Sequence, residues 1–342
     1  MKTLGIQGSQ GQSNIHVGES LDRLELYIPA GSRTIIVTDS VVRDLYGERF
    51  PKGEVISVGT GEKIKTLATI EKIMDQLIRM EADRSAFIVG IGGGIVCDIA
   101  GFAASVYLRG LDFGYVSTTL LAQVDASVGG KTGVNFGGYK NMVGMFSQPG
   151  FVICDIAFLE TLPAVEIACG FAEIVKHAVI ADKEMFAFLE QNSRKALALE
   201  RSVIQRLVYD SVCIKAGVVE QDEREKGERR KLNFGHTFGH AIEKTAGLRH
   251  GEAVSLGMVI AGALSTEKGL LHPDDQGRIV ALLESLGLPV RMEVDKDAVL
   301  DAMQKDKKRQ GNSIKFVLAD GLGSAVVQDV SLDELAEVVK GL

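Results

Sequence analysis

The residues with the clearest chemical potential are histidines grouped late in the chain. His236, His240 and His250 all lie in the segment LNFGHTFGHAIEKTAGLRHGEAV. The first two are four residues apart and therefore share one face of a helix, a spacing at which two imidazoles reach one metal ion. A catalytic zinc site has three protein ligands and an open position, so the third ligand is either His250 or a carboxylate. The candidate carboxylate is Glu173, which lies with Lys176 in the otherwise apolar run FAEIVKH, where charged groups need partners. The other histidines have no such neighbours and are interpreted as structural: His16, His177 and His272.

A second candidate site is the stretch from Ser117 to Phe146, which is rich in small residues and poor in charge. It holds one acid, Asp125, and two lysines, Lys131 and Lys140. Lysines set among glycines provide point charges beside free backbone donors, the combination that a phosphate or carboxylate needs in a partly buried pocket. The pattern therefore indicates an anion site, with exposure of either lysine on a turn as the alternative.

A glycine-rich turn from Gly90 to Asp98 reads GIGGGIVCD. It runs from the end of an apolar strand into the start of a helix, where backbone N–H groups and the helix dipole favour a pyrophosphate. The turn is not a strict G-x-G-x-x-G, and the acid expected about 20 residues later is replaced by one that precedes it, Asp39. Dinucleotide binding and a tight turn are both compatible with it.

The elements that must position these residues fall into two halves. Thr34–Thr38, Ala86–Gly90 and Gly114–Ser117 have the apolar runs of buried parallel strands. Ile64–Ala82 between two of them has helical spacing, which predicts a Rossmann-type α/β domain. From Pro163 onward the pattern changes to long amphipathic segments, which predict a mostly helical domain. The expected helices are Val165–Ile180, Lys183–Leu199, Val203–Val219, Asn233–Ala246, Glu252–Lys268 and Asp274–Leu286.

Composition sets limits on the class of protein. With 46% hydrophobic and 24% charged residues in 342, the chain has the balance of an ordinary globular protein, which excludes disordered, collagen-like and disulfide-scaffold classes. A net charge of −7 argues against nucleic acid and anionic membranes as partners. The longest nearly apolar stretch, Ala253–Leu264, is too short to span a bilayer, and we expect a cytoplasmic protein without a secretory signal. The charged run Glu223–Lys231 is predicted to be a solvated loop.

Taken together, a series of motifs resembles the 3-dehydroquinate synthase family of the shikimate pathway. In chain order the motifs are GGGIVCDIAGF, YLRG, TTLLAQVDASVGGKTGVN, KNMVGMF, FLETLP, GFAEIVKH, LNFGHTFGHAIE and HGEAVSLGM. The resemblance covers the chain from about Asp39 to about Leu318 and rests on their order and spacing. It implies an α/β plus all-α protein: a Rossmann-like NAD-binding domain over residues 1–155 and an α-helical metal- and substrate-binding domain over residues 156–342. It also implies a homodimer with the active site in the cleft between the domains.

The resemblance further implies roles for individual residues, by motif match. A zinc or cobalt ion is expected on Glu173, His236 and His250, and His240 becomes a polar group facing the substrate, which corrects the interpretation from helix spacing. The expected NAD contacts are Asp39, Glu62, Lys65, Gly93, Gly94, Ile95, Asp98, Thr118, Thr119, Leu121, Asp125, Lys131, Lys140, Phe158 and Thr161. The expected catalytic and substrate-binding residues are Arg109, Asp125, Lys131, Lys140, Asn141, Lys176, Lys215, Arg229, Asn233, His240 and either Lys307 or Lys308.

The implied activity converts an anionic sugar phosphate, 3-deoxy-D-arabino-heptulosonate 7-phosphate (DAHP), into 3-dehydroquinate and phosphate. NAD is reduced and reoxidised within each turnover, so the enzyme is a lyase with no net redox change. The alternatives are another sugar-phosphate cyclase, making 2-deoxy-scyllo-inosose or an epi-valiolone, and a metal-dependent polyol or glycerol-phosphate dehydrogenase, which releases NADH. Ser117, Phe136 and Cys97 depart from the family pattern, and we expect the local loop shape beside them to differ rather than the activity.

Overall fold

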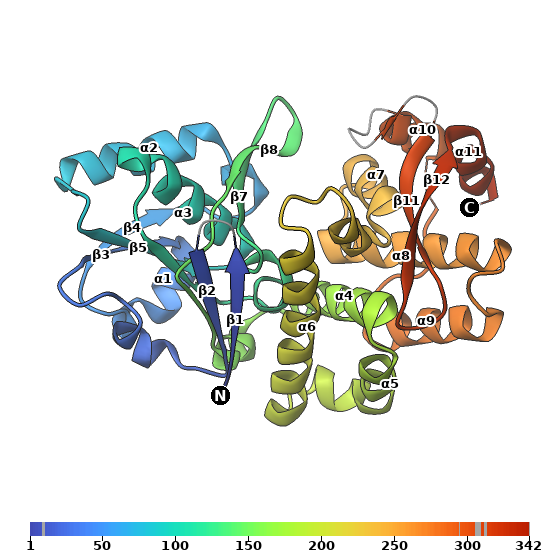
Figure 1. Ribbon diagram of the computed structural model, residues 1–342, viewed down its shortest axis with the longest axis horizontal. Helices are drawn as coiled ribbons and strands as arrows, with labels where there is room; N and C mark the ends of the chain where they lie inside the picture. The colour runs from blue at the N-terminus through green and yellow to red at the C-terminus, as the bar shows by residue number, and fades with distance from the viewer. Residues whose placement is uncertain (9–10, 294, 305–308, 311–312, 342) are drawn as a thin grey trace. The chain divides into compact units, whose positions relative to one another are not determined.

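The computed structural model of the chain describes residues 1–8, 11–293, 295–304, 309–310 and 313–341. The described chain divides into two compact units, Met1–Leu162 and Pro163–Leu342. Each unit has its own sheet and its own helices (Figure 1).

The first unit is built on a parallel sheet with one antiparallel edge strand. The strand order is β1-β2-β9-β6-β5-β3-β4, and within it β1 alone runs antiparallel to its neighbour. The strands are β1 (Lys2–Gly8), β2 (Gly11–Val17), β3 (Arg33–Asp39), β4 (Glu54–Val58), β5 (Ala86–Gly92), β6 (Phe113–Ser117) and β9 (Phe151–Cys154). Its helices are α1 (Ser40–Tyr46), α2 (Leu67–Arg79) and α3 (Gly94–Val106), and a separate hairpin comprises β7 (Lys131–Phe136) and β8 (Tyr139–Phe146). Shorter helical turns are η1 (Leu21–Leu26), η2 (Gly47–Arg49), η3 (Glu62–Ile64), η4 (Tyr107–Arg109), η5 (Ala122–Ala126) and η6 (Ile156–Thr161).

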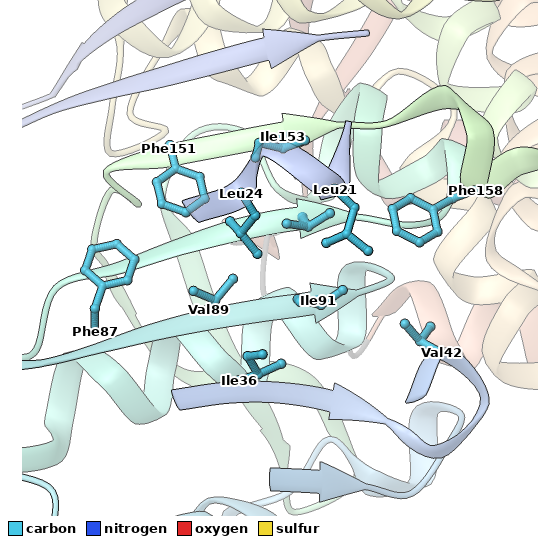
Figure 2. Packing of buried hydrophobic residues seen from close by; sticks show 11 residues of the cluster. Leu21, Leu24, Ile36, Val42, Phe87, Val89, Ile91, Phe151, Ile153 and Phe158 are labelled. Carbon is cyan, nitrogen blue, oxygen red and sulfur yellow. The ribbon is translucent and has the colours of Figure 1, made fainter. Parts of the chain in front are cut away.

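A hydrophobic cluster on one face of this sheet forms part of the core of the first unit. Strand β5 is buried along its whole length, as expected for a parallel strand covered on both faces. Its alternate residues Phe87, Val89 and Ile91 share one face with the apolar side chains of η1 (Figure 2). The ring of Phe87 stacks on that of Phe151 from β9, with centroids 5.7 Å apart. This packing holds the strands whose ends lead into the glycine turn and the neighbouring loops.

The second unit is a group of helices around α8, completed by a small antiparallel sheet. Its helices are α4 (Ala164–Ala181), α5 (Lys183–Leu197), α6 (Arg201–Gln221), η7 (Glu228–Asn233), α7 (His236–Ala246), α8 (His250–Glu267), α9 (Pro273–Ser285), α10 (Lys296–Gln304) and α11 (Leu332–Gly341). Its strands are β10 (Arg309–Gln310), β11 (Ser313–Ala319) and β12 (Ala325–Ser331). Helix α8 is apolar around most of its circumference and packs against α4, α7, α9 and β11, which makes it the central helix of the unit.

Helices α7 and α8 approach closely because glycines lie where they cross. A Cβ atom on Gly257 of α8 would stand 1.9 Å from the carbonyl oxygen of Gly235, closer than atoms can pack. Gly235 itself has a φ of +77°, a left-handed conformation that favours glycine, and it precedes the first residue of α7. The close crossing leaves the rings of His236 and His250 with centroids 5.4 Å apart.

The predicted fold class is confirmed by this architecture. The strands predicted at Thr34–Thr38, Ala86–Gly90 and Gly114–Ser117 are confirmed as parts of β3, β5 and β6. The helix predicted over Ile64–Ala82 is the shorter α2, since the side chain of Thr66 caps its first turn.

Several elements were not predicted, and one helix begins later than expected. The strands β1, β8 and β12 carry few buried residues, so they lack the continuous apolar runs by which β3 and β5 were found. The helix expected from Asn233 begins at His236 because Gly235 interrupts it.

No described helix combines the length and apolar character needed to cross a membrane.

Two adjacent valines of α1 test the packing in Figure 2. Val42 belongs to the buried cluster and is 8% exposed, whereas Val41 is 54% exposed. Replacing either by alanine relieves the same helical penalty of a β-branched residue, so the difference between the variants isolates burial. We expect Val42→Ala to lower the free energy of unfolding by about 1–2 kcal/mol more than Val41→Ala, measured by urea denaturation. Equal losses in the two variants would contradict the packing.

Candidate metal and anion-binding site

Three metal-ligating side chains of the second unit converge from different helices. Glu173 lies on α4, His236 begins α7 and His250 begins α8. One ligand atom from each lies within 4.8 Å of the others. The Nε2 atoms of His236 and His250 lie 3.7 Å and 3.2 Å from the Oε1 atom of Glu173. Two imidazoles and one carboxylate are a donor set of catalytic zinc sites, so these residues fit the ion that the sequence suggests.

Outer hydrogen bonds orient both imidazoles. The Nδ1 atom of His236 donates to the carbonyl oxygen of Phe234 at 3.1 Å, which leaves Nε2 as the ligand atom. On the other side, Nδ1 of His250 lies 3.5 Å from a carboxylate oxygen of Glu243. Glu243 was not singled out in the sequence, although it follows His240 by three residues and so shares its face of α7.

His240 lies near this group but in a more exposed position. Its ring centroid is 5.2 Å from that of His236 and 6.2 Å from that of His250. It could also form a ligand set with Glu243 and His250. That set is exposed or half-buried, whereas Glu173 and His236 are buried, and a buried carboxylate has the greater need of a cation. The geometry therefore favours Glu173, His236 and His250, the set implied by the family motifs.

A network of charges surrounds the buried carboxylate. Burial alone would raise the pKa of Glu173, but the paired ammonium of Lys176, with His250 and His236, holds that pKa well below its usual range. Burial, followed by Lys176, lowers the pKa of His236 well below its usual value. Burial likewise tends to lower the pKa of His250, but its hydrogen bonds to Glu173 and Glu243 outweigh that effect and raise the pKa to about 9. In the metal-free protein, His250 is therefore a cation at neutral pH.

Further cations are buried in the same unit. Lys176, Lys215 and Arg229, all expected substrate-binding residues, are 1%, 7% and 2% exposed. Burial lowers the pKa of the Arg229 guanidinium, although the carboxylates of Glu225, Asp222 and Glu223 oppose the shift. The expectation that the charged run Glu223–Lys231 is a solvated loop is therefore wrong at Arg229, although the other residues of the run are exposed or half-buried.

The loop that carries Arg229 is held by a carboxylate that sequence reasoning missed. Asp222, which ends α6, accepts hydrogen bonds from three backbone N–H groups of the loop, including that of Gly227 at 2.6 Å and that of Arg229 at 3.1 Å. The guanidinium of Arg229 donates to the carbonyl oxygen of Glu223 at 2.6 Å. Asn233, at the end of η7, donates to Glu225 at 2.6 Å. The acidic residues of the loop therefore fold it and orient its expected substrate-binding groups.

In the first unit, the expected NAD residues gather at the carboxyl ends of neighbouring parallel strands. Asp39 ends β3 and caps α1, and Gly93 caps α3 directly after β5. The glycine turn is compact, because a Cβ atom on Gly94 would lie 2.7 Å from the Cβ atom of Ala126. The remaining expected NAD residues at this edge, on α3, after β6 or in η6, are Ile95, Thr118, Thr119, Leu121, Phe158 and Thr161. This edge of a parallel sheet is the usual nucleotide-binding position of such folds.

A polar network links further expected residues of this unit. The buried ammonium of Lys65 bonds both Asp98 and the side-chain oxygen of Asn141. Asn135 connects Asn141 to Glu62, by accepting from the backbone N–H of Asn141 at 2.9 Å and donating to Glu62 at 2.7 Å. Expected NAD and substrate residues from α3, η3 and the β7–β8 hairpin are thus brought together.

The remaining expected residues of the first unit are more dispersed. Asp125 is half-buried in η5, and Lys131 and Lys140 are exposed on the β7–β8 hairpin. Arg109 is exposed in η4, which follows the C-terminal end of α3, whereas the glycine turn lies at the N-terminal end of that helix. A helix of the length of α3 separates its two ends by about 20 Å. Lys307 and its alternative Lys308 lie outside the described residues.

The positions that depart from the family pattern differ in burial. Ser117 ends β6 and is fully buried, Cys97 is buried in α3, and Phe136 is 57% exposed at the end of β7.

Comparisons with known proteins give one consistent family. A family model described as 3-dehydroquinate synthase N-terminal matches residues 55–169, and one described as 3-dehydroquinate synthase C-terminal matches residues 170–309. A 3-dehydroquinate synthase of Campylobacter concisus is 43% identical over 348 residues, covering 98% of each chain. Another, of Geobacter metallireducens, is 48% identical over 288 residues, covering 83% of this chain and 79% of its own.

Solved structures of sugar-phosphate cyclases are similar to the whole chain. The 2-epi-5-epi-valiolone synthase of Streptomyces hygroscopicus, with NAD⁺ and Zn²⁺ bound, has a TM-score of 0.88 at 29% identity and covers 98% of this chain and 97% of its own. A 2-deoxy-scyllo-inosose synthase with carbaglucose-6-phosphate, NAD⁺ and Co²⁺ also has a TM-score of 0.88, at 27% identity, covering 99% of this chain and 100% of its own. A probable glycerol dehydrogenase of Sinorhizobium meliloti, at 17% identity and a TM-score of 0.68, shares the fold alone.

The protonation of His250 predicts how zinc binding depends on pH. A metal ion binds neutral imidazole, so zinc must displace the proton that His250 carries below pH 9, whereas Glu173 and His236 have none to lose. We expect release of about one proton per zinc at pH 7, and an apparent affinity that rises about tenfold per pH unit up to about pH 9. Calorimetric titration in buffers with different ionisation enthalpies measures this release. His240→Ala should leave it unchanged, and proton-neutral binding at pH 7 would contradict the charge state of His250.

Proposed function

The chain belongs to the 3-dehydroquinate synthase family, and from that membership we propose that it converts DAHP into 3-dehydroquinate and phosphate. The observation that carries the proposal is the convergence of Glu173, His236 and His250 in one buried group. Relatives named 3-dehydroquinate synthase are 41–48% identical, whereas the cyclases of solved structure named above are 29% and 27% identical. The enzyme is a carbon–oxygen lyase acting on a phosphate, with no net oxidation.

Two groups of residues are proposed to bind the cofactors, one for the metal ion and one for NAD. A bound zinc or cobalt ion supplies Lewis acidity, and bound NAD⁺ supplies a hydride acceptor. Glu173, His236 and His250 would hold the ion. The proposed NAD contacts at the carboxyl edge of the first sheet are Asp39, Gly93, Gly94, Ile95, Asp98, Thr118, Thr119, Leu121, Phe158 and Thr161. Further NAD contacts are proposed for Glu62 and Lys65 at η3, for Asp125 in η5, and for Lys131 and Lys140 on the β7–β8 hairpin.

The buried cations of the second unit bind the anionic groups of DAHP. Lys215 and Arg229 are shielded from water, so their charge-assisted hydrogen bonds to a phosphate or carboxylate are strong. Lys176 keeps Glu173 ionised through their ion pair. His240, on the more exposed side of α7, orients a substrate hydroxyl or moves a proton, a task for which an imidazole is suited at neutral pH.

The other proposed contacts belong to loops and to the first unit. Asn233 at the end of η7 and Asn141 on the hairpin would bind hydroxyl groups. Asp125, Lys131 and Lys140 are proposed as further substrate-binding residues contributed by the first unit. Arg109 and either Lys307 or Lys308 are proposed as additional anion-binding groups. The same proposal has the enzyme act in the cytoplasm as a homodimer, with NAD bound by residues 1–155 and the metal ion by residues 156–342. Sedimentation velocity measures the oligomeric state.

Product analysis tests the proposed reaction. With DAHP, a catalytic amount of NAD⁺ and zinc, we expect phosphate and 3-dehydroquinate to form in a 1:1 ratio while absorbance at the NADH band stays flat. The flat absorbance follows because the proposed reaction has no net oxidation, so NAD⁺ would not be consumed. Stoichiometric NADH from a polyol, or turnover of a sugar 6-phosphate instead of DAHP, would assign the protein to one of the two alternatives.

A matched pair of variants tests the metal ligands. His236→Ala removes a ligand from the buried group, so we expect loss of bound zinc and a fall in activity of at least about 1,000-fold, since Lewis-acid stabilisation contributes several kcal/mol. His240→Ala, one helical turn away, should retain zinc at the wild-type stoichiometry. Metal content by atomic absorption and circular dichroism of both variants separate ligand loss from unfolding. Full zinc occupancy in His236→Ala would refute the assignment.

A further inference from the structure

One buried histidine of the second unit has no role in the proposed reaction. His177 lies on α4 and is 0% exposed, and neither of its ring nitrogens has a hydrogen-bond partner among the described residues. Buried polar groups are nearly always hydrogen-bonded, because leaving them unpaired is unfavourable. Sequence analysis interprets His177 as structural, yet a structural histidine would have its ring nitrogens hydrogen-bonded.

His177 lies beside the proposed metal ligand of the same helix. It follows Glu173 by four residues, so both side chains share one face of α4. A ring nitrogen of His177 and a carboxylate oxygen of Glu173 lie within 4.8 Å of each other. The carboxylate already interacts with Lys176, His236 and His250, and no hydrogen bond connects it to His177. The unpaired imidazole therefore lies at the edge of the proposed reaction site.

The charge state of His177 limits what it can bind. Burial, followed by the neighbouring Lys176, lowers its pKa to about 3, although Glu173 opposes the shift. A neutral imidazole has one N–H donor and one acceptor nitrogen. An alcohol hydroxyl is both donor and acceptor and matches either nitrogen, whereas a phosphate or carboxylate is matched better by the cations nearby.

We propose that His177 is a substrate-binding residue that hydrogen-bonds an alcohol hydroxyl of the sugar substrate next to Glu173. The inference rests on the proposed function, because it takes the polyhydroxylated DAHP as the ligand. In the complex the imidazole gains the partner that it lacks in the free protein. A binding role thus accounts for a polar group that is unfavourable for stability by itself.

Stability and activity should respond in opposite directions to an apolar replacement. In His177→Leu, a side chain of similar size removes the unpaired nitrogens, so we expect a melting temperature equal to or above that of the wild type and unchanged zinc content. We expect kcat/KM for DAHP to fall about 10- to 100-fold, because the substrate hydroxyl is left unpaired. His177→Gln, which keeps a donor and an acceptor, should recover part of this loss.

Ser211 provides the matched control. It is another buried side chain without a hydrogen-bond partner among the described residues, and it lies on α6, which packs against α4. Ser211→Ala removes the same kind of unpaired group and should leave kcat/KM within about twofold of the wild type.

The outcomes separate this inference from the function on which it rests. Wild-type turnover of DAHP together with unchanged kcat/KM in His177→Leu would overturn the inference alone. Loss of zinc from His177→Leu would indicate that His177 is a metal ligand, and failure of that variant to fold would indicate a structural role. Either result would contradict the proposal. If the wild type does not turn over DAHP, the proposed function fails and the inference fails with it.

Discussion

The second unit is organised around one buried negative charge. A carboxylate as deeply buried as Glu173 is strongly unfavourable unless cations or a metal ion compensate it. Lys176 supplies one compensating charge from the same helix, and His236 and His250 supply imidazoles from two others. Helices α4, α7 and α8 must therefore meet at one point. The absence of a side chain at Gly257 allows α7 and α8 to come that close.

The same electrostatic reasoning explains how an acidic protein can hold an anionic substrate. The net charge is −7, yet Lys176, Lys215 and Arg229 are buried in one unit. Cations removed from water interact more strongly with an anion than exposed ones, so a local arrangement outweighs the overall field. Acidic residues contribute to this arrangement indirectly. Asp222 uses its carboxylate to hold the backbone around Arg229, so the acidic residues beside the buried arginine serve to position it.

Much of the fold could be predicted because it depends on local periodicity. Strands β3 and β5 are buried on both faces, and their continuous apolar runs mark them clearly. Strands β1 and β8 are largely exposed and carry no such pattern, so the edge strand and the hairpin were missed. The charged run at Glu223–Lys231 was misjudged at Arg229 for a related reason: composition describes the average exposure of a segment and not that of a single side chain.

The candidate site, like the fold, could be predicted from the sequence only in part. By itself the sequence determined the residue types available for chemistry, the shared helix face of His236 and His240, and the motif order that marks the family. Tertiary structure decided that Glu173 comes within 4.8 Å of His236 and His250, while His240 stays on the more exposed side. It also decided that Glu243 and His177 lie beside them. Spacing along one helix is a local property, whereas the distance between groups on different helices depends on how closely those helices cross and which side chains their contact buries.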